Sequence, residues 1–296
     1  MTERPTEQSG SYRGIDTWPD VQILEALVAG QERAIAAVRQ ATPAIAEAAD
    51  RLARRLSAGG RLAYAGAGTS IRVAVQDGSE LPATFGMPEA KILYLIAGGR
   101  AAMFDTLADA EDDEADGAAQ ADDLTAADTV IAVAASGSTP FTVAVAKRAR
   151  EKGAFVIAVV NNAGSKLAAA ADLEILLATG PEVIAGSTRL AAGTAQKAAL
   201  NLLSTLTHIK LGAVHDGLMV NVETGNAKLR RRAAGIVAAI AGVEVARADE
   251  ALDLAGGHVK PAVLMCAGAK DIAAAQRLLD AANGNLRLAI ARNADT

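Results

Sequence analysis

Short apolar runs, separated by turns and amphipathic stretches, dominate the chain between about residues 60 and 180. The runs are RLAYAG, AKILYLIAG, DTVIAVAAS, AFVIAVV and LEILLAT. Each has the length of a strand, and each is too uniformly apolar for a strand with one face in water. The stretches between them fit helices. This alternation predicts an α/β fold, a doubly wound and mostly parallel sheet with helices on both faces.

Helical patterns flank this region. Between Asp20 and Leu56 apolar residues recur at helical spacing, and Pro43 divides the segment into two helices. Near the C-terminus, LDLAGGHVKPAV from Leu252 and LDAANGNLRLAI from Leu279 share one pattern: a helix end, a glycine turn and a new helix. Two copies are too few for a solenoid and indicate a small bundle. The predicted organisation is an N-terminal helical arm at 1–58, an α/β domain at 59–225 and a C-terminal helical domain at 226–296.

Composition narrows the classes of partner. The chain has 296 residues, of which 51% are apolar, with a net charge of -5 and only 3% aromatic residues. This acidic balance argues against nucleic acid as a partner. The segment MTERPTEQSGSYRG lacks the apolar core of a signal peptide, and no long apolar run suggests a membrane span, so we expect a cytoplasmic protein without a membrane partner. One cysteine, Cys266, and three histidines indicate no disulfide within the chain and no metal site.

Two turns rich in glycine and hydroxyl groups follow the first and third apolar runs. They are GAGTS, at 66–70, and ASGSTP, at 135–140. In open parallel sheets, ligands bind beyond the carboxyl ends of the strands, and a helix N-terminus with hydroxyl side chains suits an anion. A tight turn with a helix cap is the alternative for each turn alone, as an Asx turn is for Asn161 and Asn162 after the fourth run. The paired turns favour phosphate binding. The predicted binding residues are Gly68, Thr69, Ser70, Ser136, Gly137, Ser138 and Thr139.

A carboxylate follows the first turn. The segment VQDGSELPATFG places Glu80 behind the flexible pair Asp77-Gly78 and before Pro82, a residue that ends helices. A straight helix from Ser70 would carry Glu80 roughly 15 Å from a phosphate at its start. Two arrangements would solve this: the chain folds back at Gly78, or Glu80 serves a phosphate held by a second subunit. We expect the second, a homodimer with shared sites.

The chain resembles the N-acetylmuramic acid 6-phosphate etherase family. The resemblance is carried by GAGTS, SELPATFG, AEDDEADG, AASGSTP, GPEVIAGSTRLAAGTAQK and NLLSTLTHIKLG, and it extends nearly end to end. It implies a sugar isomerase (SIS) type of sheet, a C-terminal domain similar to ubiquitin-associated domains, and a homodimer. It also implies cleavage of the D-lactyl ether of a phosphorylated amino sugar, with water, to N-acetylglucosamine 6-phosphate and D-lactate. No metal or organic cofactor is implied.

The same resemblance places Glu80 and Glu111 at the family's catalytic positions. One carboxylate would remove the C2 proton of the ring-opened sugar, and the other would protonate the departing lactate oxygen. Which glutamate takes which proton stays open. The alternatives are a surface carboxylate after a helix for Glu80 and a solvated acidic run, DAEDDEAD, for Glu111.

The chain departs from the family pattern in the predicted pocket. Ile71 and Ser138 stand where the family usually has glycine and arginine, so we expect a narrower space beside the phosphate and one cationic donor fewer. Arg72, Arg189 and Lys197 are candidates for compensation, or helix-surface charges. Two other classes remain: a non-catalytic sugar-phosphate regulator, similar to glucokinase regulatory proteins, and an SIS aldose-ketose isomerase.

Overall fold

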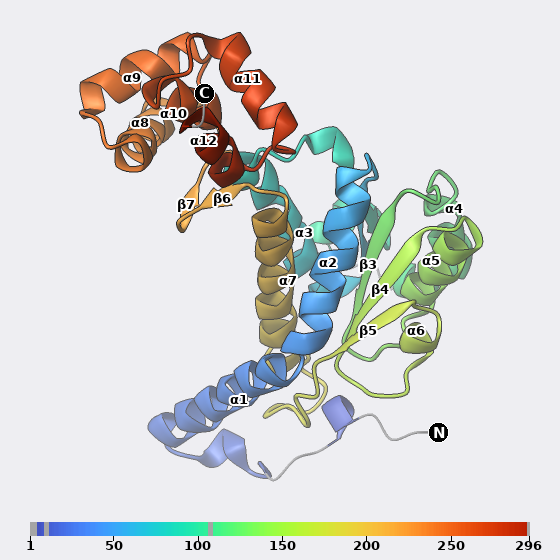
Figure 1. The fold of residues 1–296 in the computed structure, drawn as a ribbon. Coiled ribbons are helices and arrows are strands. Elements are labelled where there is room, and N and C mark those ends of the chain that lie inside the picture. Colours follow the sequence, from blue (N-terminus) through green and yellow to red (C-terminus); the bar gives the residue numbers. More distant parts are fainter. Residues whose placement is uncertain (1–4, 9–11, 106–108, 295–296) are drawn as a thin grey trace. The chain divides into compact units, whose positions relative to one another are not determined.

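The computed structural model describes residues 5–8, 12–105 and 109–294 (Figure 1). The chain divides into two compact units, one of residues 1–79 and 90–204 and the other of residues 80–89 and 205–296. These units do not coincide with the three segments expected from the sequence, whose boundaries remain predictions.

A parallel sheet forms the centre of the first unit. Its strands lie in the order β2-β1-β3-β4-β5, and every neighbouring pair is parallel. The strands are β1 (Leu62–Gly66), β2 (Ile92–Ile96), β3 (Thr129–Ala134), β4 (Phe155–Val160) and β5 (Leu173–Leu176). Each strand lies within one of the five predicted runs, and β1 and β3 are buried at every residue. The predicted α/β class and parallel sheet are confirmed.

Helices cover both faces of this sheet. In Figure 1, α2 and α7 lie on one side, and α4, α5 and α6 lie on the other. The helices are α1 (Asp20–Gln40), α2 (Thr42–Ser57), α3 (Gly68–Phe85), α4 (Glu114–Gln120), α5 (Pro140–Glu151), α6 (Lys166–Ala169) and α7 (Ala191–Lys210), with 3-10 turns η1 (Pro5–Glu7), η2 (Ile15–Thr17), η3 (Glu89–Lys91), η4 (Arg100–Met103) and η5 (Ala110–Asp112). The predicted division of the N-terminal segment is confirmed, because Pro43 lies in the first turn of α2.

The course of α3 corrects the expectation about Pro82 and removes the fold-back alternative at Gly78. Helix α3 continues through Gly78 and Pro82 to Phe85, so the proline does not end it and the chain does not fold back. An internal proline costs a hydrogen bond, and burial offsets this cost. Leu81 is 2% exposed, and Phe85 stacks on His208 with ring centroids 4.5 Å apart.

The pair Asp77-Gly78 is a fixed part of α3, not a flexible one. Asp77 is 4% exposed and accepts hydrogen bonds from Tyr64 (2.7 Å), Asn201 (2.6 Å) and Ser204 (2.9 Å). Burial, followed by the charge of Asp77, raises the pKa of Tyr64 well above its ordinary value, so Tyr64 stays a donor. These contacts hold the middle of α3 against β1 and α7.

The second unit contains a hairpin and a helical bundle. Strands β6 (Val214–His215) and β7 (Leu218–Met219) are antiparallel and are joined by Asp216 and Gly217, which both have positive φ. The helices are α8 (Ala227–Ala241), α9 (Val245–Leu254), α10 (Val259–Cys266), α11 (Ile272–Ala281) and α12 (Leu286–Ala294).

The predicted internal repeat is confirmed in this bundle. Gly257 donates its N–H to the carbonyl of Leu252, and Gly284 donates to Leu279, both at 2.8 Å. Each bond closes a helix end in the same way before the next helix begins. None of the helices in the described ranges combines the length and apolar composition needed to cross a bilayer.

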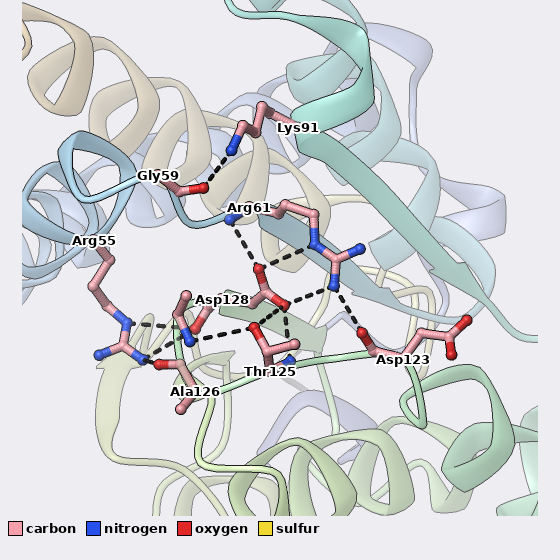
Figure 2. Close-up of polar contacts among 9 residues, drawn as sticks. Arg55, Gly59, Arg61, Lys91, Asp123, Thr125, Ala126 and Asp128 are labelled. Atoms are coloured by element: carbon pink, nitrogen blue, oxygen red, sulfur yellow. Dashed lines mark hydrogen bonds and ion pairs between the residues drawn. The ribbon is translucent and has the colours of Figure 1, made fainter.

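An ion pair between the half-buried Arg61 and the buried Asp128 fixes the amino ends of β1 and β3 (Figure 2). Arg61 donates to both carboxylate oxygens of Asp128 at 2.7 to 3.1 Å, and Thr125 donates to the same carboxylate. Burial favours the neutral acid, but the Arg61 and Thr125 donors outweigh it and lower the pKa of Asp128 to about 2. Arg55 adds bonds to the carbonyls of Ala126 and Asp128. The opposite ends of these two strands carry the paired turns.

Candidate functional site

A cavity of about 810 Å³ lies at the carboxyl edge of the sheet in the first unit. The strand order runs one way from β1 to β2 and the other way through β3, β4 and β5, so the ends of β1 and β3 form the switch point where such sheets bind ligands. The predicted residues that line the cavity are Gly68, Thr69, Ser70, Ser136, Ser138, Thr139 and Glu111. The structure thus brings both turns and one of the two glutamates together.

The first turn differs in detail from expectation. Helix α3 begins at Gly68, so Thr69 and Ser70 lie in its first turn rather than at a cap before it. Gly68 has a φ of 53° and needs the conformational freedom of glycine. The first N–H groups of an α-helix lack partners within the helix, so this turn offers donors as well as hydroxyls.

Ile71 does not narrow the cavity. Its side chain is buried in the core, and Ile71 is not among the lining residues. The prediction that Ile71 narrows the space beside the phosphate is therefore wrong.

The second turn is organised around its own hydroxyl groups. The Ser138 N–H and Oγ lie 3.2 and 3.3 Å from the Ser136 Oγ. Thr139 precedes α5 without a side-chain capping bond, and Pro140 occupies the first helical turn as predicted. Thr139 lines the cavity, and its hydroxyl, which does not cap α5, is available to a ligand. Gly137 lies behind the lining with a φ of 65°.

Glu111 lies directly against the first turn. Its Oε1 is 2.9 Å from the position that a Cβ would take on Gly68. Glu111 belongs to η5, where Asp112 also lines the cavity. One carboxylate of the acidic run thus reaches the position at which α3 begins.

Glu80 is placed elsewhere. It is exposed on α3, belongs to the second compact unit, and is not among the lining residues of this cavity. The sequence grouped Glu80 with Glu111, and of the two only Glu111 is among the residues that line this cavity.

Asn161 and Asn162 are structural, although not as a simple Asx turn. The buried Asn161 donates to the Leu177 carbonyl and accepts from Gln196, both at 2.9 Å. Asn162 donates to the Ala135 carbonyl at 2.8 Å and to the Thr6 hydroxyl at 2.9 Å. The bond to Thr6 holds η1, which places Glu7 on the cavity.

The loop after β5 completes the lining. Glu182 is buried and accepts hydrogen bonds from the N–H groups of Ala191 and Ala192 (3.0 and 2.9 Å) at the start of α7. This bidentate contact closes the loop that brings Gly186 and Thr188 to the cavity. The motif GPEVIAGSTRLAAGTAQK gave the family resemblance, but it did not reveal these roles.

The structure does not place the candidate compensating cations among the residues that line the cavity. Arg72 donates to the carbonyls of Met103 and Ala102 at 3.0 and 3.1 Å. Arg189 and Lys197 are exposed, and none of the three is among the lining residues. Lys166, which the sequence did not single out, does line the cavity.

The fold and site define a class, the SIS-domain proteins. Residues 103–206 match the family model of the SIS domain, and residues 44–149 match that of the glucokinase regulatory protein N-terminal SIS domain. A phosphoheptose isomerase structure from Francisella tularensis shares the fold with a TM-score of 0.51 and 19% identity, over 65% of this chain and 98% of that one.

Sequence identity to named relatives is higher. Proteins named N-acetylmuramic acid 6-phosphate etherase are 45% identical in Streptomyces avermitilis, over 94% of this chain and 90% of that protein, and 44% identical in Deinococcus radiodurans, over 97% and 95%. The relative from Klebsiella aerogenes is 40% identical, over 98% of this chain and 96% of that protein. The chain belongs to the N-acetylmuramic acid 6-phosphate etherase family.

Proposed function

We propose that this protein cleaves the D-lactyl ether of N-acetylmuramic acid 6-phosphate, yielding N-acetylglucosamine 6-phosphate and D-lactate. The observation that carries the proposal is one cavity, in a chain of the etherase family, where Glu111 lies against Gly68 beside the hydroxyl groups of both turns. The cavity size suits a small ligand of the sugar-phosphate class.

The two turns serve as the phosphate anchor in this proposal. The first turn of α3 and the hydroxyl-bearing residues Ser70, Ser136 and Thr139 line one cavity at the positive end of a helix. Several converging donors hold a phosphate in one orientation. The sugar ring then has a fixed position relative to Glu111.

The chemistry requires two proton transfers. Ring opening gives a C1 aldehyde, which acidifies the C2 proton. A carboxylate removes that proton, its electron pair forms the C2–C3 double bond, the C3–O bond breaks, and an acid protonates the lactate oxygen. Water then adds its hydroxyl to C3 and a proton to C2. The first half of this sequence is an elimination, so we propose that the enzyme is a carbon-oxygen lyase.

Glu80 supplies the second carboxylate in this proposal. It follows Gly68 by 12 residues on one continuous helix, which corresponds to about 18 Å at 1.5 Å per residue. A single sugar phosphate does not span that length along its own helix. We therefore propose a homodimer in which Glu80 of each chain serves the cavity of the partner chain.

The direct test is to incubate the protein with N-acetylmuramic acid 6-phosphate and assay D-lactate, with Glu80→Gln as control. We expect lactate from the wild type and a loss of at least about 100-fold in the variant. Binding of N-acetylglucosamine 6-phosphate without lactate above the control would overturn the etherase proposal in favour of a regulator. Isomerised sugar without lactate would favour an aldose-ketose isomerase.

A further inference from the structure

The charged side chains of the cavity are unbalanced. Among the described residues that line it, Glu7, Glu111 and Asp112 carry carboxylates, and Lys166 is the one cation. A phosphate monoester carries a charge near -2 at neutral pH, so it enters a region where these carboxylates repel it. Hydroxyl and N–H donors supply hydrogen bonds but no full positive charge. Lys166 is the side chain able to offset the repulsion.

The backbone of Lys166 is fixed against the second turn from both sides. Ser165, the residue before it, packs so closely on Gly137 that a Cβ at Gly137 would overlap the Ser165 side chain. Leu167, the residue after it, donates its N–H to the Gly137 carbonyl at 2.9 Å. The Lys166 Cα therefore lies beside the turn that contains Ser136, within a lysine side chain's reach of a ligand held there.

The ammonium group of Lys166 is available for a ligand. Its side chain is exposed, and within the described part of the chain it makes no hydrogen bond or ion pair. Lys166 also lines a neighbouring hollow of about 540 Å³ with Lys147, Arg150 and Glu151. Lys147 lines that hollow but not the sugar-phosphate cavity, and so offers a matched control.

We propose that Lys166 pairs with the substrate phosphate at the second turn and sets the preference of the site for phosphorylated sugars. The identity of the sugar in this inference rests on the proposed function, whereas the pairing of Lys166 with a phosphate does not. The single flexible cation of Lys166 would then supply the charge that Ser138 cannot.

The test measures binding by titration calorimetry, with inorganic phosphate and N-acetylglucosamine 6-phosphate as probes. We expect Lys166→Met to weaken the binding of both probes about tenfold. This is the lower end of the range for a hydrogen bond to a charged group, because the lysine is exposed. Lys147→Met should bind as the wild type does, and Lys166→Arg should keep most of the affinity. The difference in phosphate affinity between the wild type and Lys166→Met should become smaller as the salt concentration rises, because salt screens the charge of Lys166.

A third probe locates the charge. D-lactate carries the carboxylate but no phosphate, so its inhibition of the wild type and of Lys166→Met should be equal. Unchanged phosphate affinity in Lys166→Met, equal losses in Lys147→Met, a loss confined to D-lactate, or no phosphate binding by the wild type would each overturn the proposal.

These outcomes separate the two proposals. Lactate release with wild-type KM and phosphate binding in Lys166→Met would leave the etherase activity standing and remove the role of Lys166. Phosphate binding that depends on Lys166, without lactate release by the wild type, would support the role of Lys166 and contradict the etherase activity.

Discussion

Asp128 shows how one buried carboxylate can link pH to stability. Its pKa is about 2 in the folded chain, against about 3.9 for an unfolded aspartate. A lowered pKa stabilises the fold above the unfolded value, and this contribution disappears as the pH falls through the folded value. The pH window that matters is therefore about 4 down to 2.

We expect Asp128→Asn to lower the free energy of unfolding by about 2 kcal/mol at pH 7 and by much less near pH 2, because most of the stabilisation by the Asp128 carboxylate is lost as the pH falls from about 4 to about 2. Urea unfolding at several pH values measures this. Asp123→Asn is the control, because Arg61 donates a hydrogen bond to the Asp123 carbonyl, while the Asp123 carboxylate acts on Arg61 through its charge alone. An equal loss of stability in Asp128→Asn at all pH values would contradict the argument that the charge of Asp128 makes stability depend on pH.

Glu111 offers a second test at the scale of one residue. If it transfers a proton, Glu111→Gln should reduce kcat by about 100-fold to 10,000-fold while KM changes little. Glu114→Gln removes a charge from the same acidic run, but Glu114 lies in the first turn of α4 and not on the cavity. Equal losses in both variants would show that the charge of the run matters, not the position of Glu111.

The sequence predicted the helices and strands whose positions follow from the local pattern of apolar and polar residues. Continuous apolar runs gave the strands because a parallel sheet buries both faces of each strand. The continuation of α3 past Pro82 was not predictable, since it depends on the burial of Leu81 and on the stacking of Phe85 on His208. The place of Lys166 was hidden for the same reason: it follows from contacts of its neighbours with Gly137, 28 or more residues earlier.

Gly78 tests the fixed middle of α3. A Cβ at this position would lie 2.7 Å from the Tyr94 hydroxyl and 2.8 Å from the Tyr64 ring. We expect Gly78→Ala to destabilise the protein by about 1 to 3 kcal/mol, although alanine favours helices. Gly235→Ala is the control, because this glycine of α8 has open space around its Cβ position and should be neutral or stabilising. Thermal melting compares the two, and a stable Gly78→Ala variant would contradict the packing argument.

For the whole molecule, the proposed sharing of sites predicts complementation. Chains with Glu80→Gln, refolded together with chains carrying Ser136→Ala and Ser138→Ala, should form mixed dimers with one intact site each. Equal random mixing makes half of the dimers mixed, so we expect about a quarter of the wild-type D-lactate rate, because each mixed dimer has one working site of two. Each variant alone should be inactive. A mixture that stays inactive although mixed dimers form would count against sharing.

The hydrogen bond from the Leu167 N–H to the Gly137 carbonyl gives the molecule a built-in spectroscopic reporter. It joins the turn after β3 to the start of α6 beside the cavity, so its strength follows the separation of these two segments. A ligand that draws the two segments together should slow exchange of this one amide with deuterium and shift its NMR resonance. Occupancy of the site would then be observable without any turnover.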